Sequence, residues 1–117
     1  MIGTLYMVEL TVADWARSVR WYGDFLDLQP TLSVEADRFA LFEAGPLRLA
    51  LREGDARPGS VRLTFEVADL DAQLTRLAAL GVLVEGEVKI SREGYRRALL
   101  RDPDGHALSL FEWVRPG

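Results

Sequence analysis

The 117-residue sequence has no cysteine and a single histidine. Without cysteine there can be no disulfide, no thiol nucleophile and no thiolate metal ligand. The sequence also lacks any apolar run near the length of about 18 residues that a membrane-spanning helix needs. Its first residues, MIGTLYMVELTV, show neither the basic start nor the small-residue cleavage site of a signal peptide. We therefore expect a cytoplasmic protein with no membrane partner.

Positive charge is scarce as well. Lysine and arginine number 14 against 18 aspartate and glutamate residues, which gives a formal net charge of −4. No basic run forms a stripe, so nucleic acid is not expected as a partner. Hydrophobic residues make up 49% of the chain and charged residues 27%, a balance typical of soluble globular proteins. The length suits a single domain over residues 1–117.

What the sequence does contain is an internal repeat. The segment MVELTVADW, from Met7, aligns with RLTFEVADL, from Arg62, at an offset of 55 residues. The segment PLRLALRE, from Pro46, aligns with GHALSLFE, from Gly105, at an offset of 59, so the second copy has four additional residues between Val84 and Leu99. Two matching blocks in the same order predict two copies of one structural unit, over residues 1–55 and 59–117.

Each copy has the pattern of a strand, a helix and three further strands, a βαβββ unit of an α+β protein. Alternating apolar residues predict the first strand at 5–12, and its repeat is RLTFEV. Apolar residues at helical spacing predict helices at 15–27 and 70–80, with Asp14 and Asp69 as N-caps and Gly81 after the second helix. The other strands are expected at 29–34, 38–43, 47–52, 83–90, 96–101 and 106–113, and the polar segment 53–60 as a linker.

Two segments carry a resemblance to a known family. ELTVADWARSVRWYGDFLDLQP near the start and RDPDGHALSLFEW near the end are similar to the vicinal oxygen chelate superfamily. This superfamily includes glyoxalase I, extradiol dioxygenases, fosfomycin-resistance enzymes and bleomycin-resistance proteins. The resemblance implies that the two βαβββ units form a curled mixed sheet around a cup, and that the chain forms a homodimer.

The resemblance also implies where a metal would lie. In the family, His and Glu at four strand positions hold a divalent metal that polarises two substrate oxygens. In this sequence those positions are Met7, Ala50, Arg62 and Ser109. Alanine has no donor atom, an arginine cation repels a metal, and methionine is a soft ligand. We therefore expect no metal and no other cofactor. Strand parity turns His106 away from the face of Ser109, so we expect it at the surface or a hairpin end and not as a ligand or base.

The residues on the predicted inner face indicate a different use of the cup. Arginines can grip a carboxylate or phosphate through two hydrogen bonds, and aromatic side chains can hold a flat apolar group. The candidate ligand-binding residues are Met7, Glu9, Arg48, Arg52, Arg62, Glu66, Ser109 and Phe111. The alternative is that Arg48 forms an ion pair with Glu9 and Arg62 one with Glu66, and that neither pair binds a ligand. The connection around residues 91–95 could close over the cup.

Three functions stay open at this point. The favoured one is a metal-free protein of the glyoxalase and bleomycin-resistance type that binds a small organic, possibly anionic, molecule. The alternatives are a metal-dependent lyase, isomerase or dioxygenase with an atypical ligand set, and a scaffold dimer with a vestigial site. The sequence identifies no catalytic residue, so whether the chain is an enzyme also stays open.

Overall fold

The computed structural model describes residues 2–114, and its contacts divide the chain into two compact units, Met1–Arg57 and Pro58–Gly117. The boundary lies inside the predicted linker. The first unit contains β1 (Met7–Val12), α1 (Trp15–Phe25), β2 (Gln29–Val34), the 3-10 helix η1 (Glu35–Asp37), β3 (Phe39–Ala44) and β4 (Leu47–Glu53). The second contains β5 (Arg62–Glu66), α2 (Leu70–Ala79), β6 (Glu85–Ile90), β7 (Tyr95–Arg101) and β8 (Ala107–Trp113).

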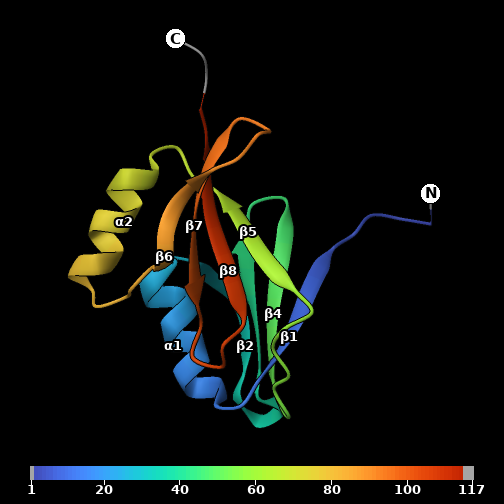
Figure 1. The fold of residues 1–117 in the computed structure, drawn as a ribbon. Coiled ribbons are helices and arrows are strands. Elements are labelled where there is room, and N and C mark those ends of the chain that lie inside the picture. The colour runs from blue at the N-terminus through green and yellow to red at the C-terminus, as the bar shows by residue number, and fades with distance from the viewer. Residues whose placement is uncertain (1, 115–117) are drawn as a thin grey trace. The chain divides into compact units, whose positions relative to one another are not determined.

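Each unit has one four-stranded sheet, and the strand order is the same in both (Figure 1). The orders are β1-β4-β3-β2 and β5-β8-β7-β6. The first strand of each unit runs parallel to the last one, and the other neighbours are antiparallel. Two parallel strands need a crossover connection between them. In each unit this connection starts with the helix. The structure therefore confirms the α+β fold of two βαβββ repeats.

Both helices begin at the predicted aspartates. The Asp14 carboxylate accepts a hydrogen bond from the Arg17 amide at 3.1 Å, and the Asp69 carboxylate accepts one from the Ala72 amide at 3.0 Å. These bonds satisfy amides that the first helical turn leaves without a partner. Gly81 follows α2 with a φ of 83°, the left-handed conformation that the sequence predicts there.

A glutamate from the last strand of each unit also holds the start of the helix. Glu53 accepts a hydrogen bond from the Trp15 amide, and Glu112 accepts one from the Leu70 amide, both at 3.1 Å. The two glutamates are the final residues of the aligned segments PLRLALRE and GHALSLFE. A carboxylate is favourable at this positively polarised end, so each helix is fixed to its own sheet.

Several element boundaries differ from the sequence prediction by one or two residues, and at two of them the backbone turns left-handed. The first helix ends at Phe25 and not at residue 27, because Asp27 has a φ of 55°. Likewise β3 begins at Phe39, since Arg38 has a φ of 48°. Within the described residues, no helix is both long enough and apolar enough to cross a membrane.

Candidate ligand-binding site

The second unit contains a cavity of about 510 Å³ on one face of its sheet. On β5, β7 and β8 successive lining residues are two positions apart, as expected for one face of a sheet. Ligand pockets commonly have volumes of roughly 300–1,000 Å³. The lining comes from all four strands and from the β6–β7 connection, drawn in orange in Figure 1. It consists of Arg62, Thr64, Lys89, Ile90, Ser91, Glu93, Tyr95, Arg97, Ser109, Phe111 and Trp113.

Three aromatic side chains form an apolar wall of this cavity. Tyr95, Phe111 and Trp113 contact one another edge to face, with ring centroids 5.3–5.7 Å apart. Such contacts fix the orientation of each ring. Trp113 nevertheless keeps 46% of its surface exposed, so part of this aromatic wall is open to a ligand.

A pair of hydroxyl groups lies on the floor of the cavity. Thr64 and Ser109 are neighbours in the parallel register of β5 and β8, and their hydroxyl oxygens are 2.8 Å apart. Ser109 is only 2% exposed. Its hydroxyl is therefore hydrogen-bonded within the protein and almost inaccessible to solvent.

The charged part of the lining is mainly cationic. Arg62, Lys89 and Arg97 come from β5, β6 and β7, and among residues 2–114 none of them lies within ion-pair distance of a carboxylate. The carboxylate of the lining, Glu93, accepts a hydrogen bond from the Ser91 hydroxyl instead. That bond, helped by a backbone amide, lowers the pKa of Glu93 below its ordinary 4.5. The cavity thus holds cations without acidic partners.

The neighbouring arginine of β7 has a different role. Arg96 faces α2, where its guanidinium lies 3.0 Å from the Asp71 carboxylate and 3.8 Å from that of Glu112. Hydrogen bonding to Arg96 holds the pKa of Asp71 below its ordinary value. Arg96 therefore joins the helix to the sheet, whereas Arg97 faces the cavity.

The arginines predicted for the first unit do have partners there. The Arg52 guanidinium lies 3.3 Å from the Glu9 carboxylate and 4.7 Å from the centre of the Phe39 ring. Arg48 lies over the ring of Tyr6 at 5.7 Å. A mutually satisfied glutamate–arginine pair thus exists on this sheet, but Glu9 pairs with Arg52 and not with Arg48.

Of the residues predicted in the second unit, three line the cavity and one does not. Arg62, Ser109 and Phe111 belong to the lining. Glu66 shares the face of Arg62 on β5 but lies outside the lining, and the described residues contain no Arg62–Glu66 ion pair. That these residues bind a ligand stays a prediction.

Sequence reasoning missed two cations of the cavity, Lys89 and Arg97. The alternation of YRRALLR could have revealed Arg97, because Ala98 and Leu100 are the buried residues that face the other way. Lys89 was not readable in this way. β6 changes register between Glu85 and Lys89, and Gly86 there has a φ of 74°. This shift amounts to two residues and preserves parity, but Val88 is the only residue of EGEVKI that is even partly buried, so the strand has no apolar alternation to read.

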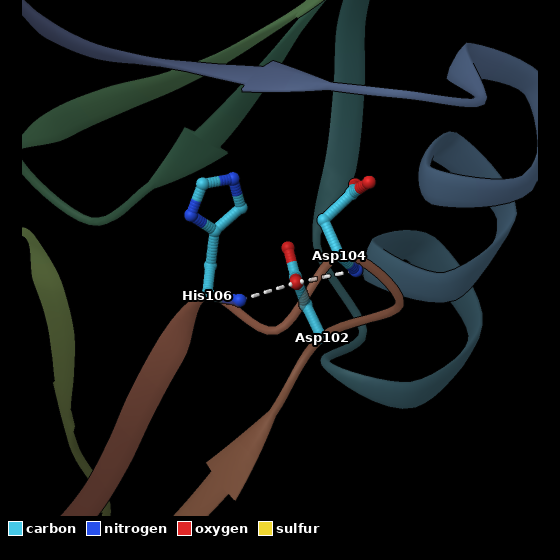
Figure 2. A group of neighbouring side chains, drawn as sticks. All are labelled: Asp102, Asp104 and His106. Atoms are coloured by element: carbon cyan, nitrogen blue, oxygen red, sulfur yellow. Dashed lines mark hydrogen bonds between the residues drawn. The ribbon is translucent and has the colours of Figure 1, made fainter. Parts of the chain in front are cut away.

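A second group of polar side chains lies in the turn between β7 and β8. Asp102, Asp104 and His106 have potential ligand atoms that all lie within 4.8 Å of one another. Figure 2 shows the three side chains rising on the same side of the turn. One oxygen of Asp102 accepts hydrogen bonds from the amides of Asp104, at 2.9 Å, and His106, at 2.8 Å. The group is therefore a turn capped by its own first residue.

His106 lies at a hairpin end, one of the two places expected for it, but it is only 5% exposed and has two carboxylates beside it. Its amide donates to the Asp102 carboxylate, which is 6% exposed. That His106 is neither a ligand nor a base stays a prediction. Two carboxylates and an imidazole are also donors that divalent metals accept.

The sequence matches the family model of the glyoxalase-like domain over residues 7–111. The chain belongs to this family. The resemblance to the vicinal oxygen chelate superfamily is thereby confirmed. No curated protein matches the sequence significantly.

Several solved structures share the fold over nearly the whole chain. A lactoylglutathione lyase from Agrobacterium tumefaciens has a TM-score of 0.79 and 22% identity, covering 94% of this chain and 93% of its own. A glyoxalase/bleomycin resistance protein/dioxygenase from Nocardioides has a TM-score of 0.80 and 22% identity, over 100% and 87%. An integron cassette protein from a Halifax Harbour sewage outfall metagenome has a TM-score of 0.81 and 23% identity, over 95% and 99%. At these identities the likeness concerns the fold alone.

The glyoxalase-like fold brings no suitable donors to the four positions that the resemblance assigns to a metal. Met7 is partly exposed on β1, and Ala50 is buried without any donor atom. Arg62 lines the cavity with a cationic side chain, and the Ser109 hydroxyl is bonded to Thr64. These residues do not fit the divalent metal of the family, whose ligands must be neutral imidazoles or carboxylates.

Proposed function

We propose that this glyoxalase-like protein binds a small organic molecule without a metal, and that the ligand occupies the cavity of the second unit. The observation that carries the proposal is the composition of that cavity. It joins an aromatic wall to cations without acidic partners, and Arg62 and Ser109 stand in it where metal ligands would be.

The chemistry of the lining favours binding over catalysis. A general base must reach a substrate proton with a free lone pair. Glu93, the carboxylate of the lining, accepts a hydrogen bond from Ser91 that lowers its pKa and so makes it a weaker base. Arginines and lysine are donors at neutral pH, and the aromatic rings supply contact area. Such a cavity can hold and orient a molecule, but it offers little with which to move a proton.

A metal-dependent enzyme is the second candidate, and one observation favours it. The turn that contains Asp102, Asp104 and His106 offers three donors within 4.8 Å of one another. A metal there would have an atypical ligand set for the family. Against this reading, one oxygen of Asp102 is already used by two backbone amides.

Thermal unfolding in the presence of a metabolite set and of zinc, nickel, manganese and iron salts tests the proposal. A ligand present at about 100 times its Kd stabilises the folded state by about 2.7 kcal/mol, which is readily detected. We expect organic compounds to raise the Tm of the unmodified protein without added metal. The effect should be lost with Trp113→Ala, which removes part of the cavity wall.

Leu83→Ala is the matched control, because Leu83 belongs to the same unit, is 81% exposed and lies outside the lining. This variant should keep the response to every ligand. Compounds that act only together with a metal would favour the enzyme. If no compound changes the Tm, the scaffold with a vestigial site becomes the better description.

A further inference from the structure

Two cations of the cavity face each other directly across neighbouring strands. Lys89 of β6 and Arg97 of β7 are partners in the antiparallel register. Like charges in this position are destabilising. Among residues 2–114, no carboxylate lies within ion-pair distance of either side chain to offset the repulsion. The ligand-free protein therefore keeps an unfavourable pair in its cavity.

The bulge of β6 creates this pair. Glu85 is the partner of Leu99, so regular pairing would place Glu87 opposite Arg97 two residues further on. The register shift between Glu85 and Lys89 places Lys89 there instead. The bulge thus replaces an attractive pair by a repulsive one. Bulges are frequent beside functional sites, where they redirect side chains.

The two cations also stand between two hollows. Besides the main cavity, Lys89 and Arg97 line a second one of about 250 Å³, together with Glu85, Gly86, Glu87 and Leu99. An anion held between the cations would therefore be reachable from either side.

The first unit shows what the second lacks. There, Arg52 is opposite Phe39 in the register and lies over its ring, and Glu9 completes the group as an ion-pair partner. In the second unit Arg97 is opposite Phe111, again an arginine beside a phenylalanine on neighbouring strands. The acid, however, is missing. An acidic group from outside the chain would complete the second arrangement.

Resting on the proposed function, we propose that the ligand is a flat aromatic anion. Its acidic group lies between Lys89 and Arg97, and its ring contacts Phe111 and Trp113. Arginine donates two parallel hydrogen bonds to a carboxylate or phosphate, while lysine adds a point charge. The edges and faces of the aromatic wall suit a planar ring, since stacked and edge-to-face contacts are both favourable.

Stability of the ligand-free protein gives the first test. Lys89→Glu restores an attractive pair with Arg97 and should raise the Tm by about 1–5 °C at low ionic strength, where surface charges are least screened. Arg92→Glu is the matched control, because it makes the same charge change next to β6 outside the lining, and it should not raise the Tm. A Tm that is unchanged or lower in Lys89→Glu would overturn the repulsion argument.

Binding gives the second test, with calorimetry on naphthoate, its neutral amide and cyclohexanecarboxylate. Naphthoate should bind at least about tenfold more tightly than its amide, a difference of about 1.4 kcal/mol that one hydrogen bond to a charged group can supply. It should also bind more tightly than cyclohexanecarboxylate, which keeps the acid but has no aromatic ring. Lys89→Glu and Arg97→Gln should remove the preference for the acid over the amide, and Arg92→Gln should retain it. Circular dichroism of each variant checks that the fold is intact.

The failures of the two proposals are distinguishable. If the acid and the amide bind equally, or if only neutral or cationic members of the metabolite set raise the Tm, the cavity binds ligands but the anion assignment is wrong. If no compound of either set binds, the proposed function fails, and the assignment fails with it.

Discussion

The capped turn between β7 and β8 provides the sharpest test of what holds this part of the molecule together. Asp102 is 6% exposed, and one of its carboxylate oxygens accepts two backbone hydrogen bonds, at 2.9 and 2.8 Å. Asp102→Ala removes the acceptor and leaves the amides of Asp104 and His106 in a largely buried place. Hydrogen bonds to charged groups contribute about 1.5–3 kcal/mol each, so we expect a loss of roughly 2–4 kcal/mol after partial compensation by water.

Urea unfolding followed by tryptophan fluorescence measures this loss, because the midpoint should fall while the slope stays the same. Asp102→Asn is the matched control. It keeps an acceptor oxygen without the charge, and should therefore lose clearly less than the alanine variant. A loss below about 1 kcal/mol for Asp102→Ala would refute the view that this carboxylate caps the turn.

Two other variants, Asp104→Ala and His106→Ala, separate a capped turn from a metal centre. If the turn is structural, zinc, nickel, manganese and iron should not raise the Tm of the unmodified protein. They should not raise the Tm of Asp104→Ala either. A stoichiometric metal whose stabilising effect disappears in Asp104→Ala and His106→Ala would contradict this reading. It would also return the metal-dependent enzyme to first place.

Further predictions concern the helix contacts, pH, metal and assembly. Glu112→Ala should lower the free energy of unfolding by about 1–2 kcal/mol, because the Leu70 amide loses its acceptor, and urea titration measures this. Hydrogen bonding to Arg101 lowers the folded-state pKa of Glu85 from 4.5. The contribution of Glu85 to stability is therefore present above pH 4.5 and is lost as the pH falls through the folded pKa. Unfolding titrations should show Glu85→Gln to be less stable than the parent at about pH 7, with no difference between them in acid. The quadruple variant Met7→His, Ala50→Glu, Arg62→His and Ser109→Glu introduces the metal ligands of the family. If these positions align with the family's strands, calorimetry should detect metal binding by this variant and none by the unmodified protein. Sedimentation at tens of micromolar should show the homodimer that the resemblance implies, and a monomer would contradict it.

The fold was predictable because the sequence contains the pattern of the same structural unit twice. Each βαβββ unit repeats the aspartate that caps the helix, and the blocks at offsets of 55 and 59 residues fix which strands correspond. The glutamates that hold the helices were visible in the same alignment, as the shared last residue of PLRLALRE and GHALSLFE, yet a single alignment gives no contact. Only the structure shows that Glu53 and Glu112 reach the first amides of α1 and α2.

The site was less predictable, for two physical reasons. Face assignment from alternation needs buried apolar residues to count from, and in β6 only Val88 is partly buried, which leaves the direction of Lys89 undetermined. Exposure in a tight turn depends on hydrogen bonds that no periodicity describes. Alternation alone turned His106 away from the face of Ser109, but the bond of its amide to Asp102 is what accompanies its burial.

The internal repeat offers a comparison within one molecule between what the fold needs and what a site needs. On the helix side of each sheet the copies agree, since Asp14 matches Asp69 and Glu53 matches Glu112 in sequence and in contacts. On the opposite face they differ. Arg52, which has Glu9 as its partner, corresponds to Phe111, and Glu9 itself corresponds to Thr64.

If the fold alone determined the residues on these faces, both copies should carry similar ones, because the two sheets have the same strand order. The two copies keep the contacts that hold the start of each helix, whereas the faces turned away from the helices differ in charge. In the first unit that face is satisfied by its own ion pair, whereas in the second it carries cations without acidic partners among the described residues. Specialisation of the second copy for an acidic ligand, as proposed above, would account for both the difference and its position.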